Sequence, residues 1–183
     1  MKLATLKTAG RDGTLAVVDR ALTRAVTVPE CVPTLQAALE DWSRTAPKLE
    51  AVYESLNTSD TEGFPFDAAA VTAPLPRAYQ WLDGSAYLTH VERVRKTRGA
   101  EMPPSLLEDP LMYQGGSDGF LGPCDPISFA NHEWGVDFEA EVAVITDDVP
   151  LGATAEQATR HIKLLMLVND VSLRNLIPPE LAK

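Results

Sequence analysis

The sequence predicts a mixed fold, mainly β with some α-helix, and three observations support this. Short apolar stretches bounded by turn residues predict strands at 2–8, 15–18 and 25–28. Apolar residues at helical spacing after Thr34, which can cap a helix, predict that a helix follows. A two-residue alternation of apolar and polar side chains over 133–145 predicts a further, longer strand.

We expect the chain to divide into two parts near residue 67. The helix after Thr34 has apolar positions from Leu35 to Trp42, and Pro47 should end it or open a second helix. Residues 57–66 are polar and contain glycine, which is typical of a linker. The sequence therefore predicts a small N-terminal β unit with one or two helices over 1–66, followed by a second domain over 67–183.

Composition argues against several classes of partner. The chain has 183 residues, 45% of them hydrophobic, and a formal net charge of -10. We do not expect it to bind nucleic acid or a membrane surface, because both reward clustered lysine and arginine. No apolar run reaches the length of a membrane span, the N-terminus lacks the apolar core of a signal peptide, and two cysteines are too few for a disulfide framework. A cytoplasmic protein with reduced thiols is the expectation.

The predicted strand over 133–145 is the most informative stretch. One face is apolar from Phe138 to Val144, and the other begins with the carboxylates of Asp137, Glu139 and Glu141. Like charges two residues apart repel, and half-burying them is costly unless a positive charge neutralises them. A divalent cation with oxygen ligands, such as Mg²⁺, Mn²⁺ or Ca²⁺, would do this. The solvated edge of an ordinary amphipathic strand would give the same pattern.

Polar residues elsewhere each have a functional and a structural interpretation. Asp83 could open a helix that carries His90 two turns further along the same face, or it could be a plain cap with an ordinary histidine nearby. Asp170 follows the apolar run 164–168 and could cap a turn or supply another oxygen ligand. Tyr113 precedes two glycines, whose spacing matches neither a dinucleotide fingerprint nor a phosphate-binding loop.

Taken in chain order, these motifs resemble the fumarylacetoacetate hydrolase family. The resemblance rests on Asp83 with His90, on Asp137-Phe138-Glu139-Ala140-Glu141, and on Asn169-Asp170-Val171-Ser172-Leu173-Arg174-Asn175. It covers residues 71–183, and the N-terminal β unit is similar to the smaller domain of the longer members. The resemblance implies a β-sandwich roll preceded by a small SH3-like β domain, usually assembled as a homodimer.

The resemblance also implies a functional site. The implied ligands of a divalent cation, Mg²⁺ or Ca²⁺ with Mn²⁺ as a further option, are Asp83, Glu139, Glu141 and Asp170. The implied catalytic base is His90, and the implied substrate contacts are Tyr113 and Arg98. Arg98 is one residue away from the family spacing, and Ser85 stands where the animal enzymes have an aromatic residue.

The implied reaction is the metal-dependent hydrolysis of a carbon–carbon bond in a β-diketo acid. Fumarylacetoacetate, which gives fumarate and acetoacetate in tyrosine degradation, is the type substrate of the family. Acylpyruvate hydrolases, oxo-acid decarboxylases and dienedioate isomerases share the same carboxylates and remain alternatives.

The chain ends sooner than the resemblance leads us to expect. Family members continue beyond the equivalent of Lys183 into a β-rich portion that supplies a catalytic lysine, so the resemblance implies a missing C-terminal portion of the same polypeptide. An inactive binding or assembly module is therefore the alternative from another functional class. We expect the apolar run 164–168 to be partly uncovered in residues 1–183 alone.

Overall fold

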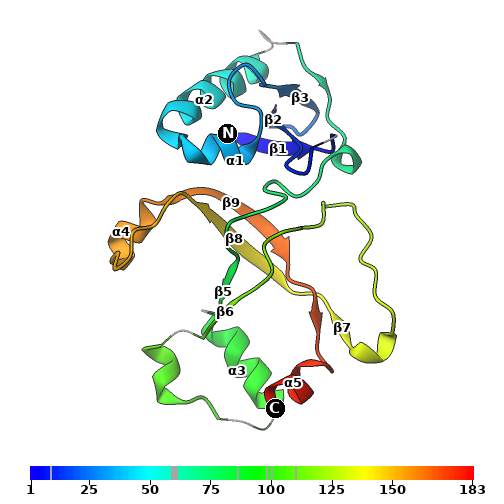
Figure 1. Ribbon diagram of the computed structural model, residues 1–183, viewed down its shortest axis with the longest axis vertical. Coiled ribbons are helices and arrows are strands. Elements are labelled where there is room, and N and C mark those ends of the chain that lie inside the picture. The colour runs from blue at the N-terminus through cyan, green and yellow to red at the C-terminus, as the bar shows by residue number, and fades with distance from the viewer. Residues whose placement is uncertain (9, 59–61, 86, 98, 100, 110) are drawn as a thin grey trace.

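A computed structural model describes residues 1–8, 10–58, 62–85, 87–97, 99, 101–109 and 111–183 (Figure 1). It contains short antiparallel strands with short helices between them, which confirms the predicted mixed class. Within the described ranges, none of the helices combines the length and apolarity that crossing a bilayer requires.

The N-terminal unit is built on a four-stranded antiparallel sheet. The strands are in the order β1 (Lys2–Leu6), β2 (Thr14–Val18), β3 (Arg24–Thr27) and β4 (Phe64–Pro65). The first three strands were expected from sequence, and β4 lies in the stretch whose composition suggested a linker. The sheet therefore gains an edge strand from residues that follow both helices.

Two helices, α1 (Leu35–Glu40) and α2 (Trp42–Thr58), pack on this sheet (Figure 1). The Thr34 side chain accepts a hydrogen bond from the Ala37 N–H and caps α1, as predicted. The expectation that Pro47 marks the helix boundary is wrong, because the break is at Asp41 and Pro47 lies inside α2. The Thr45 hydroxyl donates to carbonyls at the break, those of Ala38 and Asp41, at 2.8 Å each, which stabilises the junction there.

The main hydrophobic core lies between the sheet and these helices. Leu15 and Val17 of β2 meet Leu35 of α1 and Leu49 of α2, and all four side chains are at most 1% exposed. Asp19 is also buried, and its carboxylate accepts hydrogen bonds from the backbone N–H and the hydroxyl of Thr23. Burial alone would raise the Asp19 pKa, but these bonds and Arg24 outweigh it and lower that pKa to about 2.

The strands described in the second part form three separate two-stranded antiparallel pairs. They are β5 (Leu82–Gly84) with β6 (Met112–Gln114), β7 (Val136–Asp137) with β10 (Ser172–Leu173), and β8 (Ala140–Thr146) with β9 (Ile162–Asn169). The α-helices of this part are α3 (Leu88–Thr97), α4 (Ala155–Thr159) and α5 (Ile177–Leu181). Its short 3₁₀ helices are η1 (Ala68–Ala70), η2 (Pro104–Leu107) and η3 (His132–Trp134).

The single strand predicted over 133–145 is two strands, because the chain changes partner in the middle. β7 pairs with β10, whereas β8 pairs with β9. At the change, the Glu139 N–H donates to the side-chain oxygen of Asn169 at 3.1 Å. Glu139 therefore lies at a junction between strand pairs and not within a regular ladder.

The β8–β9 hairpin carries the second part against the N-terminal unit (Figure 1). Ile145 is buried in the main core, and Leu164 and Met166 pack against it. Ion pairs between the two parts add to this contact, with Arg77 bound to Asp12 at 2.6 Å and Lys7 to Asp125 at 2.6 Å. The face of β8 that carries Glu141 is thus the face directed toward the rest of the chain.

The opposite face of the hairpin is uncovered. Its large apolar side chains are exposed, with Leu165 at 70% and Leu167 at 83%, and the others are Phe138, Val142 and Val144. Alternate residues of the run 164–168 are therefore exposed, in line with the expectation from sequence. This uncovered face contrasts with the enclosed core of the N-terminal unit.

Candidate metal and active site

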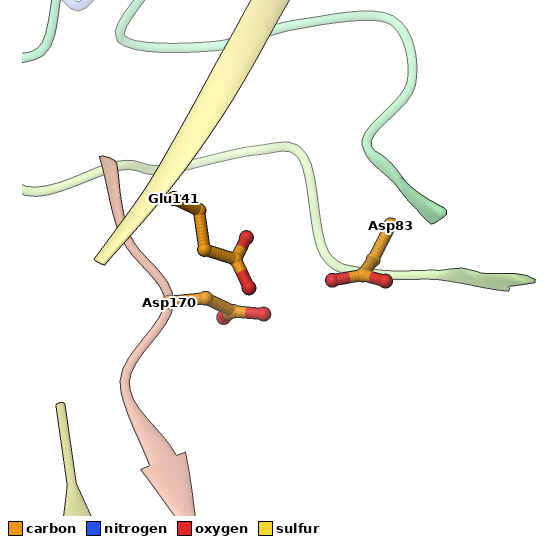
Figure 2. A group of neighbouring side chains, drawn as sticks. All are labelled: Asp83, Glu141 and Asp170. Carbon is orange, nitrogen blue, oxygen red and sulfur yellow. The ribbon is translucent and has the colours of Figure 1, made fainter. Parts of the chain in front are cut away.

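Three carboxylates from distant parts of the chain converge in the second part (Figure 2). Asp83 lies in β5, Glu141 in β8 and Asp170 directly after β9, and each is half-buried. Each offers one oxygen, and these oxygens lie within 4.8 Å of one another. Figure 2 shows the three carboxylates directed toward a common space.

The hairpin geometry explains why two of these residues are neighbours. Glu141 is opposite Val168 and Ala140 is opposite Asn169, so Glu141 and Asp170 lie one position to either side of the last pair at the open end of the hairpin. The Asp170 N–H donates to the Glu139 carbonyl at 3.0 Å, which continues the same register by one residue and fixes the backbone of Asp170. Asp83 reaches them from the β5–β6 pair, in which it is the partner of Tyr113.

The electrostatics of the three carboxylates favour a bound cation. Burial raises the pKa of Glu141, and the charges of Asp83, Asp170 and Glu139 raise it further. Within the described part of the chain, no lysine or arginine forms an ion pair with Asp83, Glu141 or Asp170. An all-carboxylate donor set of this kind fits Mg²⁺ or Ca²⁺, which prefer oxygen ligands.

Tyr113 lies beside this group. Its hydroxyl donates a hydrogen bond to Asp170, and the Tyr113 pKa is raised first by its burial and then by that bond. The Tyr113 phenol therefore contacts a candidate metal ligand directly. A hydrogen bond of this kind can orient the Asp170 carboxylate. The role of Tyr113 as a substrate contact stays a prediction.

Glu139 is directed elsewhere. Its carboxylate accepts from Arg174 Nη2 at 2.7 Å and from the Ser172 hydroxyl at 2.7 Å, and it is not among the three converging carboxylates. The same arginine binds Asp137 through Nε at 2.9 Å. Glu139 as a fourth ligand stays a prediction, and in this structure its first carboxylate oxygen binds the Arg174 guanidinium and the Ser172 hydroxyl.

His90 approaches the site through Glu139. Its Nε2 lies 3.6 Å from the second carboxylate oxygen of Glu139, and its side chain is half-exposed. The expectation that Asp83 and His90 share one helix is wrong, because Asp83 belongs to β5 and α3 begins only at Leu88. Pairing with β6 satisfies the backbone of β5, and Gly84 disfavours a helix there.

Two site residues were not assigned a role from the sequence, and one assigned residue cannot be placed. Ser172 and Arg174 follow Asp170 by two and four residues in the third motif, and both contact Glu139. Side chains two residues apart on a strand share a face. The spacing of Asp170, Ser172 and Arg174 could therefore have indicated that all three lie on the side of the candidate site. Arg98 lies outside the described residues.

Two family models match the chain, one for each part. The model described as "Fumarylacetoacetase N-terminal domain 2" matches residues 1–77. The model described as "Fumarylacetoacetate (FAA) hydrolase C-terminal" matches residues 80–183, which is more than half of the chain. No curated protein matches the chain at the significance required. The family matches confirm the resemblance seen in the motifs.

Proposed function

The chain belongs to the fumarylacetoacetate hydrolase family, and we propose that it binds a divalent cation for hydrolysis of a carbon–carbon bond in a β-diketo acid. Members of the family are generally hydrolases or related enzymes that act on small molecules. The observation that carries the proposal is the convergence of Asp83, Glu141 and Asp170 within 4.8 Å of one another. The three residues come from β5, β8 and the end of β9. Burial and the repulsion between their charges destabilise the ionised Glu141, and a bound cation would relieve that repulsion.

The cation site would be formed by Asp83, Glu141 and Asp170, with Mg²⁺ or Ca²⁺ as the expected ion. When bound, such an ion acts as a Lewis acid that stabilises negative charge developing on the oxygens of an enolate leaving group. Tyr113 orients the Asp170 carboxylate through its hydrogen bond.

His90 supplies the proton transfer in this proposal. A neutral imidazole can act as a general base and remove a proton from water at Nε2. Glu139 lies 3.6 Å from that nitrogen and would stabilise the imidazolium that results. The hydroxide formed attacks the carbonyl carbon, the adjacent carbon–carbon bond breaks, and the imidazolium can return its proton to the departing enolate. Arg98 and Tyr113 are the proposed substrate contacts.

The finer features of the fold and the assembly are part of the same proposal. Family membership supports an SH3-like N-terminal domain, a β-sandwich roll in the second part, and a homodimer. Acylpyruvate hydrolysis, oxo-acid decarboxylation and dienedioate isomerisation are the alternative reactions for the same carboxylates.

One observation favours a second candidate function, that of a binding or assembly module without activity. The outer face of the β8–β9 hairpin exposes Leu165 and Leu167 to 70% and 83%, which is more typical of an interface than of a free surface. Cation binding separates the two candidates, because an inactive module has no need to retain a saturable site.

Calorimetric titration with Mg²⁺ and with Ca²⁺ tests the proposal. The wild-type chain should show saturable binding of at least one ion, and Glu141→Gln should weaken it by about tenfold or more, since one of few charged ligands is lost. Glu156→Gln on α4 is the matched control and should bind as the wild type does. Circular dichroism checks that each variant is folded, and absence of saturable binding by the wild type would overturn the proposal.

A further inference from the structure

The side chain of Arg174 binds two carboxylates that precede the candidate ligand Glu141 in the sequence. Arg174 joins Asp137 through Nε at 2.9 Å and Glu139 through Nη2 at 2.7 Å. The Ser172 hydroxyl binds the same Glu139 oxygen at 2.7 Å. Glu139 is therefore held on the Arg174 side by two donors, although its neighbour on the same strand face, Glu141, faces the converging carboxylates.

These contacts are strong enough to fix the direction of the Glu139 side chain. The carboxylate is only 14% exposed and Arg174 30% exposed, so water screens the ion pair less than it would at an open surface. Charge-assisted hydrogen bonds from a planar guanidinium are short and directional. The shift of the Asp137 pKa below its usual value, caused mainly by the bond from Arg174, agrees with this arrangement.

We propose that Arg174, assisted by Ser172, is a positioning residue that withholds Glu139 from the cation and so sets the affinity of the site. This inference rests on the proposed function, because it concerns the cation site formed by Asp83, Glu141 and Asp170. Glu139 then has two alternative positions, one on Arg174 and one as a fourth ligand. To become a fourth ligand, the Glu139 carboxylate must shift toward the other three, and its bonds to Arg174 and Ser172 oppose that shift.

Removing Arg174 should therefore tighten cation binding, because Glu139 is freed to become a fourth ligand. A residue that merely maintained the local fold would have the opposite effect, because its loss would misplace the ligands. The sign of the change in affinity thus distinguishes the two roles.

The experiment is a Mg²⁺ titration of the whole chain by calorimetry. Arg174→Ala should bind Mg²⁺ about fivefold more tightly than the wild type or better, as expected when a fourth carboxylate can join the ligands. Arg160→Ala is the matched control, since it also removes one positive charge, from an exposed pair on α4, and should leave the affinity unchanged. Adding Glu139→Gln to Arg174→Ala should reverse most of the gain.

A second variant keeps the proposal testable if Arg174→Ala unfolds. Ser172→Ala removes the other donor to Glu139 without changing any charge, and it should tighten Mg²⁺ binding about twofold, as expected for one lost hydrogen bond. Unchanged or weaker binding by folded Arg174→Ala, or by Ser172→Ala where only that variant folds, would overturn the proposal while leaving the cation site itself intact. Absence of saturable Mg²⁺ binding in the wild type and in every variant would overturn the cation site together with this inference.

Discussion

The β2 strand and the β9 strand are similar in composition but differ in what covers them. β2 has neighbours on both edges and is covered by α1 and α2, so Leu15 and Val17 are fully buried. β9 pairs only with β8, and its inner face packs on the N-terminal core while Leu165 and Leu167 are exposed. An apolar strand is stabilising only where a second layer excludes water from it.

The comparison indicates that the N-terminal unit mainly provides stability, whereas the second region carries the candidate functional site. In the N-terminal unit, apolar side chains provide stability, and the buried carboxylate of Asp19 is satisfied by Thr23. In the second region, half-buried carboxylates meet, and among the described residues none of the lysines or arginines pairs with them, which costs stability and is typical of a functional site. Substitutions in the first region should therefore change folding, and substitutions in the second should change function or association.

The largest effect is expected at His90. His90→Ala should lower the turnover of a β-diketo acid by about a hundredfold to ten thousandfold, the usual contribution of a positioned base. The melting temperature and Mg²⁺ affinity should stay close to those of the wild type, because the side chain is half-exposed and is not one of the three converging groups. Steady-state kinetics against His132→Ala, an exposed histidine elsewhere, gives the comparison. Activity within about threefold of the wild type would make His90 structural.

The second effect contrasts two leucines. Leu49→Ala should lower the free energy of unfolding by about 2–5 kcal/mol, because Leu49 is fully buried in the main core. Leu167→Ala should change it by only about 0.5 kcal/mol or less, because Leu167 is 83% exposed. Urea denaturation followed by circular dichroism measures both. Equal losses would mean that the outer face of the hairpin is covered in solution.

The third effect concerns association through that outer face. In solutions more concentrated than those used for the titrations and the urea experiments, the chain should aggregate or elute as large species, since the exposed apolar side chains of β8 and β9 favour contact between copies. Replacing Leu165 and Leu167 together by threonine should reduce this, whereas Leu151→Thr at an isolated exposed leucine should not. Size-exclusion chromatography with light scattering reads the outcome. A monodisperse, cooperatively melting wild-type chain would contradict the prediction.

The smallest effect is a dependence on pH at the carboxylates. Burial and neighbouring charges raise the Glu141 pKa, so protonation should begin to weaken Mg²⁺ binding at a higher pH than an ordinary glutamate would allow. Stability without the ion should change in the opposite sense. The folded state binds the Glu141 proton more tightly than the unfolded state, so stability from this group is lost as pH rises through the raised pKa.

Mg²⁺ titrations and melting curves from about pH 7 to about pH 5 should reveal both trends. In Glu141→Gln the pH dependence of stability should become shallower, because the titrating group is gone. A wild-type pH profile identical to that of Glu141→Gln would show that Glu141 keeps an ordinary affinity for its proton.

The sequence by itself determined the features that depend on short-range chemistry. The first three strands of the N-terminal sheet and the Thr34 cap follow from turn residues and contacts within a few positions. The three motifs were also sufficient to identify the family, because residue types at fixed spacings survive without knowledge of the fold. In each case the physical cause lies within one element or one short loop.

Tertiary structure alone decided how the candidate site is assembled. Asp83 lies on a strand because β6, which begins at Met112, pairs with it, and such a distant partner leaves no local pattern. The alternation over 133–145 defined two faces, but only packing against the N-terminal core decided that the acidic face is covered. Glu139 and Glu141 share that face, and Arg174 and Ser172, brought beside Glu139 by the β7–β10 pair, direct it away from its neighbour. Local spacing therefore decides which face of a strand carries a side chain, and contacts with residues distant in the sequence decide the direction in which its charged group points.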